Sequence, residues 1–385
     1  MLESAVLANN RTDDMALDED FDPYANRMSY PAHKRASAIK WTAADHWCAT
    51  VETVQIQAGL RVENPHPLTE ERKGGDWPLA RLMRDYLSVE HPTMAQRDDR
   101  SILAAAVGTE ILPELLVNVA NGTTLVRMPA LLAKVLKITH AVELKNYLQS
   151  AAAAFEIDAI DAARPNFTEW HTLKPRGTAE LLGLGSSPIR LRITEQLSLR
   201  DDAVNAVAGI VAATATAAAQ NELVACFGLL EDNPTLADGD TLFIASNTAS
   251  GGAPSALILE SAIATLRKQQ LNGRNCDADP VNLICAADHE GAARAAVRTI
   301  YGDDSPVSVI GTSYLSTDAW YLQADPATWP TVARATMAGA GGNSLRFTPG
   351  RATELEGMRD TILESLHTFD YGAVSRIGIV KVPTA

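Results

Sequence analysis

Residues 198–234 read SLRDDAVNAVAGIVAATATAAAQNELVACFGLLEDNP, and this stretch decides the fold. Apolar residues recur at three- and four-residue spacing over 204–230, which is the period of one helix face. Ser198 and Asp201 form a capping-box pattern at the start, and an Asn-Pro pair ends the run. The pattern predicts one helix over 199–230, roughly 48 Å long at the usual helical rise. A helix this long and rich in Ala is expected to lie along a broad surface and pack closely against it.

The sequence after this helix alternates between helix and strand patterns. The predicted elements are a helix over 257–271, a strand over 281–286, a helix over 289–301 and strands near 307–310 and 320–323. This alternation predicts a mixed α/β domain over about 235–335. A helix around 355–364 and a β-branched strand over 377–382 are expected to close the chain.

The sequence before the long helix has two parts. Residues 101–163 show helical apolar spacing punctuated by Pro and Gly. Residues 164–200 are rich in Gly, Pro, Thr and Ser, with short strand-like pieces such as 189–193. Within 164–200 there are six Lys and Arg against three acids, a local reversal of sign in an acidic chain. We therefore predict an extended, positively charged loop.

The first hundred residues lack a continuous pattern. Residues 1–30 carry seven acids and two bases with little apolar periodicity, which is typical of a solvated tail or a partner-binding arm. Residues 31–100 have a short helical pattern around 77–87 but are broken repeatedly by Pro and Gly. We expect an extended leader here, not a compact domain.

Composition excludes several classes of protein. The 385 residues hold 33 Lys and Arg against 47 Asp and Glu, a net charge of -14, whereas tight nucleic-acid binding needs a basic surface. Four cysteines are too few for a disulfide framework, and no uncharged apolar run reaches the length of a membrane span. The start of the chain lacks the pattern of a secretory signal. We expect a soluble, non-membrane protein.

No residues assemble into a recognisable catalytic or metal-binding motif. The eight histidines form no HExxH and no cluster, and His289 between two acids is typical of a helix start. Cys276 and Cys285 flank a strand without CxxC pairs and are expected to be buried, inert thiols. The glycines of 183–186 and 339–343 lack the phosphate-loop and dinucleotide spacings, so we read them as turns. We expect no enzyme activity, no cofactor and no metal.

Five passages of the chain follow one another in a characteristic order. They are GTEILPELLVNVAN at 108–121, ITEQLSLRDD at 193–202, LLEDNPTLADGDTLF at 229–243, LNGR at 271–274 with PVNLIC at 280–285, and FDYGAV at 369–374 with RIG at 376–378. In this order they resemble tailed-phage major capsid proteins of the HK97 type, in particular those fused to a ClpP-like prohead protease. Together they cover about 105–382. Residues 1–100 depart from the fusion pattern, because they contain no serine-protease elbow.

The resemblance implies an α+β, HK97-like capsid fold with an N-terminal arm, an extended β loop, a peripheral domain carrying a long spine helix, and an axial α/β domain. The implied divisions are a leader or arm over 1–100, a helical part over 101–163, an extended loop over 164–198, the spine helix over 199–234, the axial domain over 235–335 and a return to the peripheral domain over 336–385. Three fates of the leader stay open at this point: it is cleaved, it is retained as an N-terminal arm, or it acts as a built-in scaffold.

The resemblance also implies a function. The chain would assemble with itself into hexamers and pentamers of an icosahedral procapsid that encloses double-stranded bacteriophage DNA without sequence-specific binding. Portal, scaffolding, protease or decoration proteins would be further partners, and the site would be the virion capsid, assembled in the host cytoplasm. The basic loop would reach over a neighbouring subunit, and Lys174, Arg176, Arg190 and Arg192 are the candidate contact residues. Some relatives cross-link a loop lysine to an asparagine, and Lys174 has the right position, but no asparagine or catalytic acid can be matched.

Two other functions stay open at this point. One is an encapsulin-like nanocompartment shell, which shares the fold but holds enzyme cargo in place of DNA. The other is an α/β enzyme whose site the sequence does not reveal, although no nucleophile, base or metal set can be assembled from it.

Overall fold

A computed structural model of the chain describes residues 41–72, 77–93, 96–147, 150–153, 156–157, 175–176, 179–200, 202–271, 273–350 and 360–384. Residues 42–385 form one unit, and all contacts below lie within it. The acidic tail predicted over 1–30 and the loop candidate Lys174 lie outside the described residues.

Four short helices open the described chain. They are α1 (Ala43–Gln57), α2 (Pro67–Arg72), α3 (Leu79–Glu90) and α4 (Asp99–Gly108). Thr42 and Asp45 form a full capping box at the start of α1. Buried apolar side chains of α1, α3 and α4 join the same core as the long helices that follow. The extended form expected of residues 31–100 is therefore wrong from Thr42 onward, because these helices bury their apolar faces in the main core.

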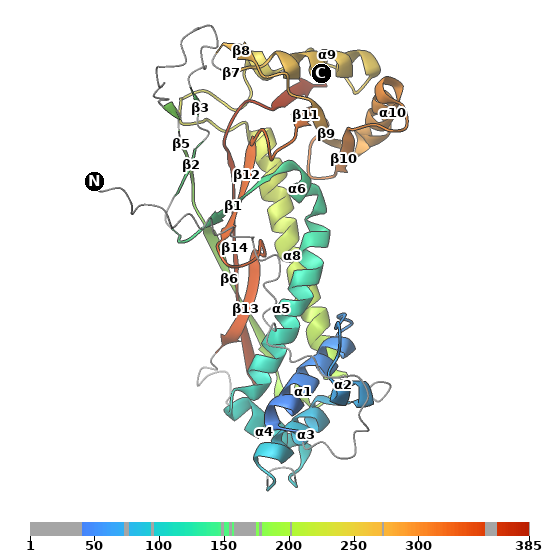
Figure 1. Cartoon of the computed structure of the whole chain (residues 1–385), viewed down its shortest axis with the longest axis vertical. Coiled ribbons are helices and arrows are strands. Elements are labelled where there is room, and N and C mark those ends of the chain that lie inside the picture. Colours follow the sequence, from blue (N-terminus) through green and yellow to red (C-terminus); the bar gives the residue numbers. More distant parts are fainter. Residues whose placement is uncertain are drawn as a thin grey trace, which may run out of the picture. The chain divides into compact units, whose positions relative to one another are not determined.

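Two long helices pack side by side in the middle of the unit (Figure 1). They are α5 (Ile111–Leu131), which is followed by α6 (Ala133–Ile138), and α8 (Ala203–Asp232). The predicted spine helix is confirmed, and Asn233 ends it in the left-handed conformation, with φ 48°. Its predicted cap is wrong, because Ser198 ends the short helix α7 (Glu195–Ser198) and α8 begins after Asp202.

The length and composition of α8 would also suit a membrane span, which the count of uncharged apolar runs did not indicate. Half of its most apolar window is buried within the chain. Its buried residues, such as Val207, Val211 and Ala215, share a core with residues of α5 and of a sheet. Buried core helices of globular proteins meet the same length and composition test, so the packing of α8 is that of a core helix.

The first sheet has five strands centred on the longest one, β14 (Thr361–Ala373). The others are β1 (His140–Leu144), β6 (Gly185–Ile193), β12 (Val332–Met337) and β13 (Leu345–Gly350). β6, β12 and β13 pair antiparallel with β14, while β1 lies parallel to β12. The helix predicted around 355–364 is wrong over 361–364, because those residues pair with both β6 and β13 as part of β14.

A narrow hairpin leaves this sheet. β2 (Ser150–Ala153) pairs with β5 (Ala179–Leu182), and β3 (Glu156–Ile157) pairs with β4 (Pro175–Arg176), both antiparallel. The part predicted to be helical, 101–163, therefore turns into strands from His140 onward. The loop predicted over 164–198 contains one arm of the hairpin, then β6, a strand of the main sheet.

The second sheet has the order β10-β9-β11-β15. Its strands are β9 (Pro280–Ala286), β10 (Ser308–Thr312), β11 (Ala319–Ala324) and β15 (Ile379–Pro383). The helices α9 (Ala256–Lys268) and α10 (Glu290–Tyr301) pack on this sheet. A small hairpin of β7 (Gln270–Leu271) and β8 (Arg274–Asn275) follows α9 in the chain. The 3-10 turns η2 (Ala245–Asn247) and η3 (Ala287–His289) complete this part. The order of helices and strands predicted from 257 to 323 is confirmed. The predicted bounds of the domain, 235–335, differ from the structure, because β12 begins at Val332 and belongs to the first sheet, whereas β15 near the end of the chain belongs to the second. The molecule as a whole is α+β, as predicted.

Candidate functional site: the basic strand and a buried charge cluster

Two of the four predicted loop residues have described side chains, and both lie on β6. Arg190 stands directly opposite Glu364 of β14, and its Nη2 lies 2.6 Å from Glu364 Oε1. Arg192 Nε donates to Asp360 Oδ2 at 2.6 Å. Both guanidinium groups stay about half exposed. For Arg176 only the backbone, in β4, is described.

These ion pairs join β6 to β14 within one subunit. Opposite charges across neighbouring strands contribute roughly 0.2–1 kcal/mol, and exposed pairs fall at the low end of such values. Asp360 also accepts the backbone N–H of Glu195 at 3.1 Å, so it anchors the start of α7 as well. The role of Arg190 and Arg192 toward a neighbouring subunit stays a prediction, because each has a partner in its own chain.

A buried charge cluster holds α8 to the first sheet. Glu222 is the only charged residue of α8 between 203 and 230, and its side chain is fully buried. Its carboxylate lies 2.8 Å from Arg334 Nε, 3.1 Å from His367 Nε2 and 2.7 Å from the Tyr371 hydroxyl, and it also accepts from Ser344. Arg334 comes from β12 and the other two long side chains from β14. One carboxylate thus ties a helix to two strands of the sheet and to the turn before β13.

Electrostatics keep this carboxylate charged. Burial would by itself raise the pKa of Glu222, but hydrogen bonds from His367 and Arg334 and the charge of Arg334 outweigh it and lower the pKa to about 2. Burial would lower the pKa of Arg334, yet the contact with Glu222 raises it. Burial, followed by the charge of Glu222, raises the pKa of Tyr371. The group is therefore an ionised pair with its remaining lone pairs satisfied, the condition under which buried charges persist.

The glycine-rich segment 339–343 completes the surroundings of the cluster. Gly339, Gly341 and Gly342 all have positive φ, and the carbonyl of Gly342 accepts from Arg334 Nη1 at 2.9 Å. The turn predicted at 339–343 is confirmed, whereas the one predicted at 183–186 is wrong at its second half, because Gly185 and Ser186 begin β6. Sequence reasoning missed the cluster itself, and the one signal that could have found it is Glu222, the single charged residue among the apolar positions 203–230.

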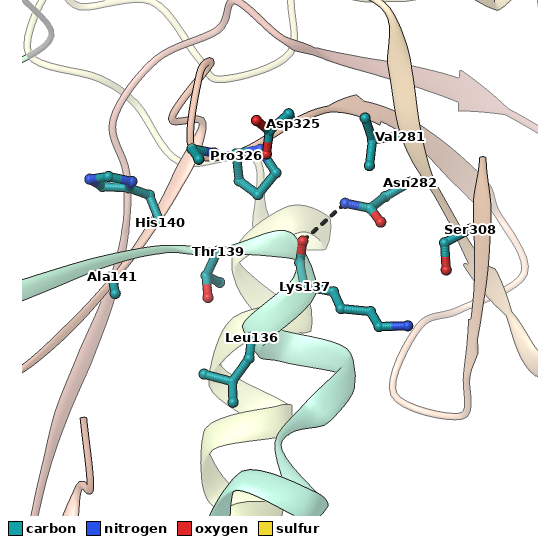
Figure 2. A pocket seen from close by; sticks show the side chains of 11 residues that line it. Leu136, Lys137, Thr139, His140, Ala141, Val281, Asn282, Ser308, Asp325 and Pro326 are labelled. Atoms are coloured by element: carbon teal, nitrogen blue, oxygen red, sulfur yellow. Dashed lines mark hydrogen bonds between the residues drawn. The ribbon is translucent and has the colours of Figure 1, made fainter. Parts of the chain in front are cut away.

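A pocket of about 470 Å³ lies where α6 and β1 meet the second sheet (Figure 2). Its polar side chains include Lys137, His140, Asn282, Ser308 and Asp325. Asn282 Nδ2 donates to the carbonyl of Lys137 at 3.0 Å and so links the second sheet to the end of α6. Asn282, which lines the pocket, therefore has a structural role.

The thiols and acids of the described residues show no metal site. No group of three or more His, Cys, Asp or Glu among them is placed to hold a metal ion. Cys285 is buried, which raises its pKa to about 11, and Cys276 is half-buried. Glu290 opens α10 and pairs with Arg294 one turn later, in keeping with the reading of this region as a helix start.

Comparison with family models identifies the chain. The model described as "Phage capsid protein" matches residues 189–382, half of the sequence. The chain belongs to this phage capsid family. The match takes in α8, the second sheet up to residue 382, the first sheet except β1 and the start of β6, and every member of the Glu222 cluster. The N-terminal helices, α5 and the β2–β5 hairpin lie outside the matched residues.

Several solved structures are similar to this phage capsid chain. The holo-SrpI encapsulin complex from Synechococcus elongatus PCC 7942 is 9% identical, with a TM-score of 0.45 over 65% of this chain and 86% of that one. A structure from Mycobacterium phage Patience is 11% identical, with a TM-score of 0.42 over 73% and 88%. The capsid of an empty GTA particle is 11% identical, with a TM-score of 0.43 over 66% and 90%. Comparison with curated proteins finds no match.

Proposed function

We propose that this chain is a major capsid protein of HK97 type, which assembles with itself into a closed icosahedral shell around double-stranded bacteriophage DNA. The observation that carries the proposal is the family match over 189–382, because those residues form the long helix, the second sheet up to residue 382 and most of the first sheet. In this proposal the first sheet with α5 and α8 is the peripheral domain, and the second sheet with α9 and α10 is the axial domain.

Exposed apolar side chains lie on several elements. Leu257 of α9 is 77% exposed, Leu181 of the hairpin and Val126 of α5 are each 63% exposed, and Val224 of α8 is 57% exposed. Single exposed apolar residues are common on protein surfaces, so they do not by themselves indicate a partner. In the proposed shell, neighbouring subunits would cover some of these side chains.

The charge of the chain is compatible with DNA as the content of the shell. A net charge of -14 disfavours adhesion of the subunit to packed DNA, so DNA can slide against the wall and leave it. Hexamers and pentamers of this chain, and portal, scaffolding, protease or decoration proteins, belong to the same proposal. So do assembly in the host cytoplasm and a final place in the virion capsid. We assign the chain no catalytic activity.

Electron microscopy and sedimentation of the purified protein test this function. We expect closed shells tens of nanometres across, and nuclease-protected DNA in particles taken from a phage lysate. Monomers or small oligomers alone, across a range of salt and pH, would contradict the shell. Shells that hold a protein cargo and no DNA would replace the viral capsid by an encapsulin-like compartment.

A further inference from the structure

Leu182 is the buried leucine of β5 at the base of the β2–β5 hairpin, and Leu184, two residues later, lies in the same small core. Leu182, at the end of β5, is 1% exposed and lies in a small separate core with Leu144, Ala333, Ala335 and Val374. The side chain before it, Leu181, is 63% exposed. Successive side chains of a strand point to opposite faces, so β5 turns Leu182 onto the sheet and Leu181 away from it.

The sheet beneath Leu182 is built from small residues. Ala333 of β12 stands opposite Gly372 of β14 in the ladder. A Cβ built on Gly372 would overlap Leu182 Cδ2, and it would lie 3.6 Å from Cγ. The missing side chain at 372 therefore makes a notch that one leucine fills. The next residues along the same strands, Arg334 and Tyr371, point to the opposite face and contact Glu222.

Two hydrogen bonds fix the hairpin base on either side of Leu182. The N–H of Gly183 donates to Asp370 Oδ2 at 3.2 Å, and Glu180 Oε1 accepts the N–H of Ala237 at 2.7 Å. Burial raises the pKa of Asp370, in agreement with its position under the hairpin base. Three consecutive contacts, one apolar and two polar, thus define the position and direction of the chain at residues 180–183.

The direction of the hairpin at its base matters, because a small rotation there displaces the strands farther along the hairpin. β2 with β5 and β3 with β4 keep one register, from Ser150 opposite Leu182 to Ile157 opposite Pro175. β4 (Pro175–Arg176) lies on this register beyond β5, farther from the base than Leu182. A change in direction at the base therefore displaces β4 by more than it displaces β5.

We propose that Leu182 in the notch over Gly372 is a positioning residue for assembly, which sets the direction of the β2–β5 hairpin so that the hairpin meets a second copy of this chain. The proposal rests on the proposed shell function. Leu182 does not itself touch the neighbour, and it acts through the rest of the hairpin. The sheet below stays whole without it, because its other face is held by the Glu222 cluster.

Substitutions on both sides of the notch test this role. Leu182→Ala empties it and Gly372→Ala fills it, so each should lower the yield of sedimenting shells by about tenfold or more, since every subunit in a shell carries the same fault. Leu182→Met keeps the volume and should restore the yield to within about twofold of the unchanged protein. Gly291→Ala, at an exposed position of α10 with open space around it, is the control for adding a methyl group.

Two further readouts separate positioning from loss of folding. Circular dichroism should show native-like secondary structure for all four unassembled variants. Mixed at a low ratio with unchanged protein, Leu182→Ala and Gly372→Ala subunits should enter shells, because their bodies still receive a neighbour's hairpin, whereas misfolded subunits would stay out. Normal shell yields from both notch variants, or exclusion of folded variants from mixed shells, would overturn the positioning role. Unchanged protein that forms no shells would instead overturn the proposed function.

Discussion

The first sheet carries ion pairs of two different kinds. In the cluster around Glu222 both charged partners are almost fully buried, and a single carboxylate accepts from four side chains. On β6, Arg190 and Arg192 pair with Glu364 and Asp360 while about half exposed. Loss of either partner of the Glu222–Arg334 pair should destabilise the subunit strongly, because the remaining buried charge cannot reach water in place of its partner. Water can replace the partners on β6, so those arginines can exchange them for others.

Neutralising the buried carboxylate should have the largest effect. Glu222→Gln leaves the Arg334 charge buried without a counter-charge, and the free energy of unfolding of the unassembled subunit should fall by about 3–5 kcal/mol. Denaturant unfolding measures this change. Glu260→Gln, at an exposed position of α9, should change it by less than about 0.5 kcal/mol. Equal effects of the two substitutions on the unfolding free energy would show that the cluster does not stabilise the subunit.

Acid should remove the same contribution without a mutation. Since the pKa of Glu222 is about 2 in the folded chain against 4.5 for a free side chain, its contribution is complete above 4.5 and is lost as the pH falls toward 2. Over that range the difference in unfolding free energy between unchanged protein and Glu222→Gln should shrink by about 3 kcal/mol. A difference that stays constant between pH 6 and pH 2 would contradict the lowered pKa.

Reversing charge on β6 should affect assembly more than folding. Arg190→Glu alone faces Glu364 and adds repulsion, so the informative variant is the exchange Arg190→Glu with Glu364→Arg, which keeps the pair and moves its positive end. The unfolding free energy should stay within about 1 kcal/mol, while the yield of shells falls. Shells at the normal yield from the exchange variant would remove the electrostatic role of Arg190 toward a neighbour.

Salt should produce the smallest effect and should separate the two kinds of pair. At 1 M salt the screening length is about 3 Å, so the coupling between Arg190 and Glu364 should drop from at most about 1 kcal/mol toward zero. The coupling between Glu222 and Arg334 should persist, because bulk ions do not reach it. Double-mutant cycles at low and high salt measure both values. Equal salt dependence at the two sites would erase the distinction.

The elements that the sequence predicts well are those with a strong local pattern. The apolar period of α8 and the alternation from α9 to β11 are confirmed, because local spacing and tertiary packing agree there. β14 was mistaken for a helix over 361–364, because pairing with strands on both sides determines its conformation more than the local spacing of its apolar residues does. The helical pattern around 77–87 is confirmed as α3, but α1 and α2 were read as part of an extended leader because Pro and Gly near them hid short elements, although the capping residues Thr42 and Asp45 were visible.

The Glu222 cluster could not be derived from sequence. Its members come from α8, from β12, from β14 and from the turn at Ser344, so the contacts span more than a hundred residues. No local pattern encodes such a meeting. The notch has the same origin, because Leu182 and Gly372 meet only when the hairpin returns to the sheet. Arg190 and Arg192 were found by their charge, but their partners in β14 were not.

The position of β14 near the end of the chain determines when a subunit becomes complete. During synthesis β6, β12 and β13 leave the ribosome before the strand that pairs with all three of them. Until residues 361–373 emerge, Leu182 has no Gly372 beneath it and Glu222 has neither His367 nor Tyr371. Pairings between such distant segments form late and slowly. A nascent chain therefore lacks a fixed hairpin base until β14 has emerged, and the proposed positioning by Leu182 would begin only then.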